Sequence, residues 1–433
     1  MSRRGQTLRG GATMSLLELP TDTVWDLKMS RIKFGYGVAS EIGYDLKRLG
    51  IRNCLIITDP ILMQIGLVDK IMQFIEEQDI GVMIWDKVEP EPSLDSMQDC
   101  INSVDSNFDG FVAVGGGSSI DSAKVIDLVL TQGGKILDYM APPFGEGKKI
   151  PGRPSKPLIA VPTTAGTGSE TTPVSVISFP EKKVKGALFC GIPTLGILDP
   201  LLTVTMPPSV TASTGMDALV HAIEAYWVRP YTSRPKPKTP LERPVYTGAT
   251  ELTDLFAERA IELIGKYLRR AVFNGNDLEA RSSMLLASFL AGVAFSNAGV
   301  SVVHAMALIV GGQFHTPHGA TNAVLLPPAI EFNIPGAPDR FACIAQLLGE
   351  TIEGLSVMEA AKKSINTTIK LSKDIGISYG LEAPPFNVKE EDIPRLAAET
   401  FKVQRLLGAN PVPITEDDLK ELFRKAMRNW TPV

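Results

Sequence analysis

The segment FVAVGGGSSIDSAKVIDLVL, residues 111–130, places an apolar run, three glycines and a helical pattern in immediate succession. Glycines between a strand and a helix let the backbone approach a ligand closely, because no Cβ stands in the way. The helix that follows presents free backbone N–H groups and the positive end of its dipole. Residues 115–118, Gly-Gly-Gly-Ser, therefore predict a dinucleotide pyrophosphate site. The GxGxxG fingerprint is missing, and three glycines without this setting could form an ordinary turn.

Apolar runs and helical patterns alternate over the whole N-terminal half of the chain. Continuous apolar strands separated by helices predict a parallel sheet that is covered on both faces. We therefore expect an α/β dinucleotide-binding domain over residues 28–205, preceded by an N-terminal extension, residues 1–27. The expected strands are 54–58, 82–85, 111–114, 158–161 and 196–198, and the expected helices are 63–78, 93–106 and 120–131.

After Pro207 and Pro208 the strand signals nearly vanish and helical patterns dominate. This change predicts an all-α domain over residues 206–433. The expected helices are 209–228, 250–273, 277–295, 298–312, 338–349, 357–375, 390–401 and 415–429.

Length and composition exclude several classes of protein. A chain of 433 residues is too long for one ordinary core, so two domains with a cleft between them are expected. The net charge of −5 argues against a nucleic-acid partner, because phosphate binding needs a basic field. The four cysteines have no CxxC spacing, which favours the reducing cytoplasm over a disulfide framework. Polar residues and glycines interrupt the apolar segment 285–314, so it predicts buried core helices and no membrane partner.

Two segments have an unusual composition. Residues 1–17 carry three arginines and no acidic residue, which fits a transit peptide less well than an upstream start codon or simple disorder. Residues 229–245, RPYTSRPKPKTPLERPV, are too rich in proline to continue a helix. This insertion predicts a stiff loop between two helices, either solvated at the surface or placed as a basic rim over a substrate cleft.

Polar side chains follow two of the expected strands. Residues 162–170, PTTAGTGSE, come directly after the strand 158–161, where open α/β sheets bind ligands. A helix-capping cluster is the alternative, but three threonines and one serine within seven residues exceed what one cap requires. Asp59 ends the first of the expected strands. Its carboxylate could accept hydrogen bonds from an adenosine ribose and repel a 2′-phosphate, which would favour NAD over NADP. It could equally cap the turn before Pro60.

The few histidines are concentrated around one candidate metal site. Asp217 and His221 have i, i+4 spacing and therefore share one face of a helix. Glu224 lies on the same stripe and could hold the His221 ring. His304 lies in an apolar helix, and a buried histidine needs a partner, either a hydrogen-bonding group or a metal. His318 follows 14 residues later. One carboxylate and three imidazoles suit Fe²⁺ or Zn²⁺, and the ligand types do not choose between them.

Four motifs, GGGSSIDSAK, PTTAGTGSE, GMDALVHAIEAY and HAMALIVGGQFHTPHGATNAVLLP, together resemble the iron-containing (group III) alcohol dehydrogenases. The resemblance implies a Rossmann-like N-terminal domain, a helical metal-binding domain, and a nicotinamide and metal site between them. The implied metal ligands are Asp217, His221, His304 and His318. The implied cofactor contacts are Asp59, Gly116, Gly117, Ser118, Thr163, Thr164, Thr167 and Lys185, and Asp121 is expected to fix the phosphate loop.

The chain departs from the family pattern at two positions. Leu308 stands where many members have a histidine four residues after the first ligand of the later pair, so that residue's proton relay is absent. His315 is the candidate catalytic substitute, although solvent or a cofactor hydroxyl could serve equally. Glu91 stands where an amide is common. The segment Arg243-Pro244-x-Tyr246-x-Gly248 is similar to the hydroxyacid–oxoacid transhydrogenase branch.

The resemblance implies an oxidoreductase that transfers a hydride between a small alcohol or hydroxyacid and NAD, giving an aldehyde or ketone. Fe²⁺ is the implied metal, and a homodimer or larger homo-oligomer is expected. A transhydrogenase with tightly held cofactor is the main alternative. Three further alternatives are a glycerol-type dehydrogenase, a cyclase resembling dehydroquinate synthase and a nucleotide-binding scaffold. The set of four metal ligands argues against the scaffold.

Overall fold

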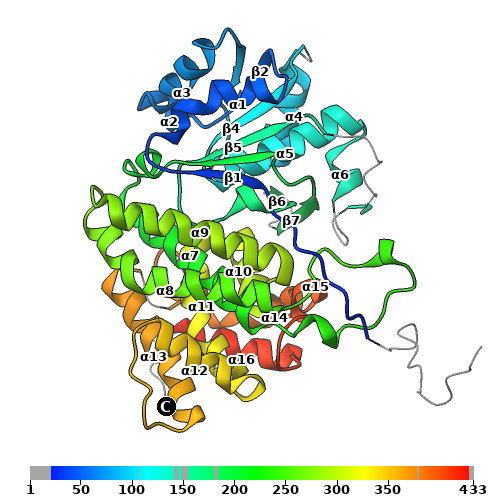
Figure 1. Ribbon diagram of the computed structural model, residues 1–433. Coiled ribbons are helices and arrows are strands. Elements are labelled where there is room, and N and C mark those ends of the chain that lie inside the picture. The colour runs from blue at the N-terminus through cyan, green and yellow to red at the C-terminus, as the bar shows by residue number, and fades with distance from the viewer. Residues whose placement is uncertain are drawn as a thin grey trace, which may run out of the picture.

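The computed structural model describes residues 21–105, 107–140, 145–147, 155–179, 184–377 and 380–428. A sheet with flanking helices forms one half of the molecule, and a group of helices forms the other half (Figure 1). The expected fold class, a parallel α/β domain followed by an all-α domain, is confirmed.

Six strands form the central sheet in the order β1-β8-β5-β4-β2-β3, and every neighbouring pair is parallel. The five strands predicted from apolar runs are all present and lie next to one another, and the sixth strand, β1, pairs with β8 at one edge. The sheet strands are β1 Arg31–Phe34, β2 Asn53–Ile57, β3 Gly81–Trp85, β4 Gly110–Gly115, β5 Leu158–Pro162 and β8 Leu195–Leu198.

Both faces of this sheet are buried, which explains why its strands read as continuous apolar runs. Along β4, Phe111 and Ala113 enter one core, and Val112 and Val114 enter the other. Helices α4 and α5 cover the first face, and α1 and α3 cover the second. Their bounds are α1 Ile42–Arg48, α3 Leu67–Glu76, α4 Leu94–Ser103 and α5 Gly117–Gln132.

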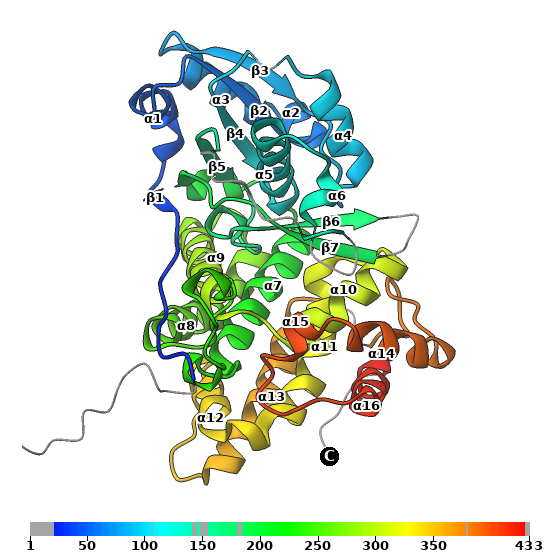
Figure 2. The ribbon, with the colours of Figure 1, turned by 90° about the vertical axis from the view of Figure 1, so that its right-hand side faces the viewer.

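Three features of this domain differ from the sequence prediction. The helix expected over 63–78 is two helices, α2 (Pro60–Gln64) and α3, because Gly66 adopts a left-handed conformation between them. Strand β1 was not expected. An antiparallel hairpin, β6 (Val174–Phe179) with β7 (Val184–Phe189), was also not expected, and β7 packs against helix α10 at the junction of the two domains (Figure 2). A short helix, α6, spans Ile136–Tyr139.

The second domain is built around α7, which packs against α8, α9 and α11. Helix α11 was not expected, because Pro327 and Pro328 lie within it. By length and composition alone, α9 could span a membrane, but 67% of its most apolar window is buried inside the protein. The helices are α7 Pro208–Trp227, α8 Glu251–Phe273, α9 Leu278–Ala298, α10 Val302–Phe314, α11 His318–Asn333, α12 Pro338–Leu347, α13 Val357–Asp374, α14 Ile393–Phe401, α15 Gln404–Leu407 and α16 Glu416–Met427.

The proline-rich insertion 229–245 packs against the described part of the N-terminal extension. Arg234 and Arg243 both form ion pairs with Asp22, at 3.2 and 2.8 Å. The Asp22 amide also donates a hydrogen bond to the Arg234 carbonyl. Two of the insertion's cations therefore bind the chain's own N-terminal segment. Residues 1–20 of the expected extension lie outside the described residues, and with them the targeting alternatives.

Candidate active site

The glycine-rich loop joins β4 to α5 and lies against the second polar loop. Gly115 has φ +151°, and Gly116 precedes the first residue of α5. The Gly115 carbonyl accepts a hydrogen bond from the Thr163 amide at 3.0 Å. A Cβ on Gly117 would lie 2.7 Å from the Thr167 side chain, so this position has room only for glycine. The two loops form one surface at the carboxyl ends of β4 and β5, where open α/β sheets bind ligands.

Asp121 has partners other than the expected ones. Its carboxylate accepts hydrogen bonds from Lys124 at 3.2 Å, from the Val176 amide at 2.9 Å and from the Ser169 hydroxyl. These partners belong to α5, to β6 and to the second polar loop, and none of them is in the glycine loop. Asp121 therefore joins the second loop and the β6–β7 hairpin to α5.

The Asp59 side chain caps helix α2. Its Oδ1 accepts hydrogen bonds from the amides of Ile61 and Leu62 at 3.0 and 3.1 Å. The capping role weighed in the sequence is thus present. The proposed ribose contact remains a prediction, and Asp59 does not line the central cavity described below.

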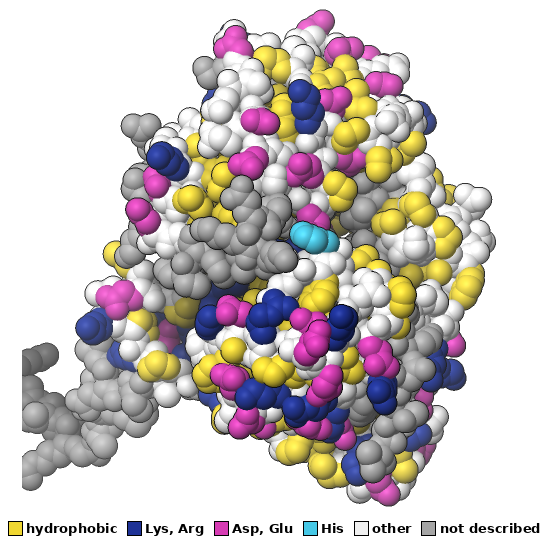
Figure 3. Space-filling view, turned by 180° about the vertical axis from the view of Figure 1, so that it is seen from behind, with side chains coloured by type: hydrophobic (Ala, Val, Ile, Leu, Met, Phe, Trp, Pro, Cys, Tyr) yellow, Lys and Arg dark blue, Asp and Glu magenta, His cyan; other side chains and the backbone are white. Residues whose placement is uncertain are grey.

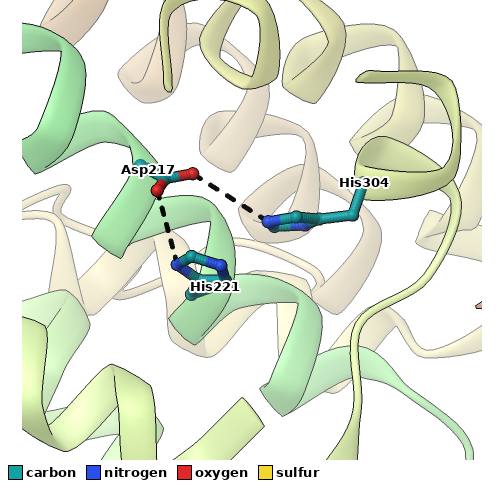
Figure 4. Close-up of side chains that lie close together, drawn as sticks. All are labelled: Asp217, His221 and His304. Carbon is teal, nitrogen blue, oxygen red and sulfur yellow. Dashed lines mark ion pairs between the residues drawn. The ribbon is translucent and has the colours of Figure 1, made fainter. Parts of the chain in front are cut away.

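Three helices bring the predicted metal ligands together. Asp217 and His221 project from α7, His304 from α10, and His318 is the first residue of α11. The ligand atoms of Asp217, His221 and His304 all lie within 4.8 Å of one another (Figure 4). The His318 Nε2 atom is 3.7 Å from Asp217 Oδ1. The structure therefore gathers the four side chains around a single point.

Glu224 contacts His304, so the prediction that it holds His221 is wrong. Its Oε2 lies 2.6 Å from His304 Nδ1, and its carboxylate accepts the backbone amides of Val303 and His304 at 2.9 and 3.2 Å. It also accepts the Ser301 hydroxyl at 2.8 Å. Glu224 thus caps the start of α10 and orients one imidazole. With Nδ1–H donating to Glu224, the Nε2 lone pair is directed toward Asp217.

Asn322 also belongs to the centre, and the sequence analysis missed it. Its Nδ2 donates to Asp217 Oδ1 at 2.7 Å and lies 3.3 and 3.2 Å from Nε2 of His304 and His318. Asn322 follows His318 by one helical turn, a spacing that would have indicated it if α11 had been predicted.

The donor set fits a divalent first-row metal. Within the described residues, two buried polar atoms at the centre, His221 Nδ1 and Asn322 Oδ1, have no hydrogen-bond partner. Unpaired buried polar atoms are costly, and a coordinated cation would satisfy such atoms. One carboxylate with three imidazoles matches the ligand preferences of Fe²⁺ and Zn²⁺.

Electrostatics keep these groups in the protonation states that bind a cation. Desolvation lowers the pKa of His221 to about 4 and that of His318 to about 3, so both rings are neutral near pH 7. Burial acts to raise the pKa of Asp217, but the three imidazoles and Asn322 outweigh it and the pKa is lowered overall. A neutral imidazole and an ionised carboxylate are the forms that ligate metals.

A cavity of about 1320 Å³ joins the metal ligands to the cofactor loop. Its wall includes Gly117, Ser118, Thr167 and Asp121 from the α/β domain and Asp217, His221, His304 and His318 from the helical domain. Gly116, Thr163 and Thr164 lie in the same loops but do not line it. One space thus reaches both predicted binding sites.

Lys185 and His315 meet at Glu91 on the edge of this cavity. Lys185 donates a hydrogen bond to Glu91 Oε1 at 2.7 Å, and His315 Nδ1 lies 3.9 Å from Glu91 Oε2. The His315 side chain is 61% exposed, and a histidine reaches the surface between the two halves of the molecule in Figure 3. Leu308 lines the cavity at the position where the family commonly has a relay histidine. His315 therefore lies outside the metal cluster, and its catalytic role stays a prediction.

Comparison with known proteins gives matches over both domains. Residues 29–200 match the family model for iron-containing alcohol dehydrogenases, and residues 241–427 match that for the C-terminal part of the Fe-containing alcohol dehydrogenase family. The chain is 37% identical over 426 residues to the mitochondrial hydroxyacid-oxoacid transhydrogenase of Rattus norvegicus, covering 94% of this chain and 91% of the other. It is 39% identical over 396 residues to the NAD-dependent methanol dehydrogenase of Bacillus methanolicus, covering 91% and 97%.

Solved structures agree with the sequence matches. The crystal structure of a 1,3-propanediol oxidoreductase superposes with a TM-score of 0.85 at 38% identity, covering 93% of this chain and all of the other. The sulfoacetaldehyde reductase from Bifidobacterium kashiwanohense, in complex with NAD+, gives a TM-score of 0.79 at 29% identity, covering 94% and 99%. The chain therefore belongs to the iron-containing alcohol dehydrogenase family.

Proposed function

We propose that this oxidoreductase transfers a hydride between the carbinol carbon of a small alcohol or hydroxyacid and NAD, and that Asp217, His221, His304 and His318 would hold the metal ion that the reaction uses. The observation that carries the proposal is the shared cavity. It brings Asp217, His221, His304 and His318 into the same space as Gly117, Ser118 and Thr167. A protein that only binds the nucleotide would need the cofactor-loop residues but not the metal ligands.

The chain's own residues supply position and charge. Asp217 and the three imidazoles would hold the ion, which would supply Lewis-acid stabilisation of the reacting oxygen when bound. Glu224 fixes the His304 ring through its 2.6 Å contact. The glycine loop and the start of α5 would hold the pyrophosphate of the dinucleotide, whose nicotinamide accepts the hydride. Lys185, at the cavity wall, would bind near the cofactor ribose.

The direct test is metal reconstitution. Purified protein would be stripped with a chelator, reloaded with Fe²⁺ or Zn²⁺, and assayed for NADH formation with a panel of short alcohols and hydroxyacids. We expect activity to follow the bound metal and to return on reloading. Full activity after complete removal of the metal would contradict the proposal.

A transhydrogenase is the second candidate, because several relatives at 36–37% identity carry that name. In that reaction the cofactor stays bound while a hydroxyacid is oxidised and an oxoacid is reduced. We expect turnover without added NAD only if this candidate is right. The assay therefore omits free NAD and supplies both acids, and a strict requirement for added NAD would exclude it.

We further propose that the protein works as a homo-oligomer in the reducing cytoplasm, without nucleic-acid or membrane partners. All four cysteines are unpaired, and burial raises the pKa of Cys54, Cys100 and Cys190 to about 12, which suits inert thiols. Light scattering tests the assembly, and imaging of the tagged full-length chain tests the location. A monomer in solution would overturn the proposed assembly, and a signal confined to an organelle would overturn the proposed location.

A further inference from the structure

Arg405, at the cavity wall, is a cation with no carboxylate partner among the described residues. The other two Lys or Arg side chains of this wall are paired: Lys185 with Glu91 at 2.7 Å, and Lys402 with Glu399 at 2.6 Å. Arg405 forms no ion pair within the described part of the chain. On the helical half of Figure 3, basic and acidic side chains are intermixed. Of the three Lys and Arg side chains of this cavity wall, Arg405 is therefore the one without a carboxylate partner among the described residues.

Tyr246 holds Arg405 in place. The guanidinium carbon lies 5.7 Å from the centre of the Tyr246 ring, within the range of a cation–π contact. Burial raises the pKa of Tyr246, and the positive charge of Arg405 opposes that rise. Tyr246 is half-buried and also lines the cavity. A long side chain that is fixed in this way loses less freedom when it binds an anion.

Both residues lie close to the helix that carries His304. Helix α15, which contains Arg405, packs against α10. The Tyr246 side chain packs against Gly299 shortly before α10, where a Cβ would come within 3.1 Å of the Tyr246 Cβ. Apolar side chains of the same cavity, including Phe295, Val300 and Leu406, complete the wall. The cavity thus combines a cluster of metal ligands, an apolar wall and one arginine without a carboxylate partner among the described residues.

Resting on the proposed function, we propose that Arg405, supported by Tyr246, binds the carboxylate of a short-chain hydroxyacid whose hydroxyl reacts at the metal ligands. A guanidinium can meet a carboxylate with two parallel hydrogen bonds. The apolar wall would contact the carbon chain between the two ends. In the proline-rich insertion, which could instead have formed a basic rim over the cleft, Arg234 and Arg243 are already paired with Asp22. Arg405 therefore determines preference for acids over neutral alcohols.

The experiment compares substrates of equal chain length on the metal-loaded enzyme. The pairs are 3-hydroxypropanoate with 1,3-propanediol and 4-hydroxybutanoate with 1,4-butanediol. We expect the wild type to favour the acid of each pair in kcat/KM. Arg405→Gln should lower the acid-to-diol ratio by about tenfold or more, and Arg405→Lys should restore part of it. The KM for the acids should rise with salt in the wild type and respond less in Arg405→Gln.

Lys402→Gln is the matched control, because it removes a cation of the same wall that is already paired with Glu399. We expect it to leave the acid-to-diol ratio within about twofold of the wild type, as is usual for an exposed, paired charge. A ratio unchanged in Arg405→Gln, or lowered equally in Lys402→Gln, would overturn the assignment. A wild type that favours the diols would also overturn it.

The two proposals fail in different ways. A wild type that oxidises the diols but does not prefer the acids, or an unchanged acid-to-diol ratio in Arg405→Gln, would reject only the role of Arg405. Absence of NADH formation with every substrate would reject the proposed function. Binding of butanoate to the metal-loaded enzyme, measured by calorimetry, tests the anion site without turnover and also serves if Arg405→Gln does not fold. Equal affinity for butanoate in the wild type and in the Arg405→Gln and Arg405→Ala variants would contradict the inference.

Discussion

The two sides of the cavity are built in different ways. On the α/β side, the cofactor surface is mostly backbone, from two loops that each follow one strand directly. On the helical side, the metal centre consists of side chains from α7, α10 and α11, and Glu224 and Asn322 hold them from behind. We expect cofactor binding to be weakened mainly by substitutions that add a side chain to the loops. We expect metal binding to be weakened mainly by substitutions that remove a ligand or its hydrogen-bond partner. The changes below test this difference, from the largest expected effect to the smallest.

His304→Ala should have the largest effect. It removes an imidazole from the ligand set and takes from the buried Glu224 carboxylate its imidazole partner. We expect bound metal and turnover to be lost together, while NAD binding persists because the glycine loop is untouched. Metal analysis measures the loss of the ion, and fluorescence titration with the cofactor measures the retained NAD binding. Retained turnover with a full metal complement would refute the ligand role.

Glu224→Gln should weaken metal binding without removing a ligand. The amide can keep some hydrogen bonds at the start of α10 but loses the charge that sets the His304 tautomer. Changes to such supporting groups typically reduce metal affinity by about 10–100-fold. Competition with a chelator measures this affinity. An affinity equal to that of the wild type would show that Glu224 only caps the helix.

Gly117→Val should affect the cofactor side alone. The added Cβ would lie 2.7 Å from Thr167, so the two loops must separate. Overpacking of this kind costs about 1–3 kcal/mol, which predicts a rise of about 5- to 100-fold in the KM for NAD at an unchanged metal content.

Gly35→Ala is the control for Gly117→Val, because nothing lies within 4 Å of a Cβ there. We expect it to keep the wild-type KM for NAD. If both variants raise the KM equally, the glycine loop has no special role.

Asp59→Asn should have the smallest effect. Asparagine keeps the cap on α2, since its side-chain oxygen can accept the same amides, but it removes the negative charge. We expect a rise of a few fold, about 2–5, in the use of NADP relative to NAD, on the ribose-contact hypothesis. Steady-state kinetics with both cofactors measures the ratio. A ratio that does not move would leave Asp59 with its capping role alone.

The sequence predicted those parts of the fold that depend on local pattern. The strand, glycine run and helix of residues 111–130 are contiguous, and each has a direct physical signal. Helix α11 was missed because Pro327 and Pro328 normally end a helix, whereas here packing against α7 and α10 outweighs that preference. The β6–β7 hairpin was missed because its strands do not belong to the parallel sheet.

The predicted site was correct for residues with a spacing signal and incomplete where tertiary packing decides. Asp217 and His221 share a helix face, so their proximity follows from sequence. Glu224 shares the same stripe, but only the position of α10 beside α7 determines that it meets His304. No local pattern could indicate Arg405, because its meaning depends on which charges remain unpaired in the folded chain.

The most direct test of the account is a crystal structure with NAD and the bound metal, using anomalous diffraction at the metal absorption edge. The account predicts one anomalous peak, coordinated by Asp217, His221, His304 and His318, in the cavity that also holds the nicotinamide. A peak at another place, or these four side chains turned toward separate pockets, would contradict it.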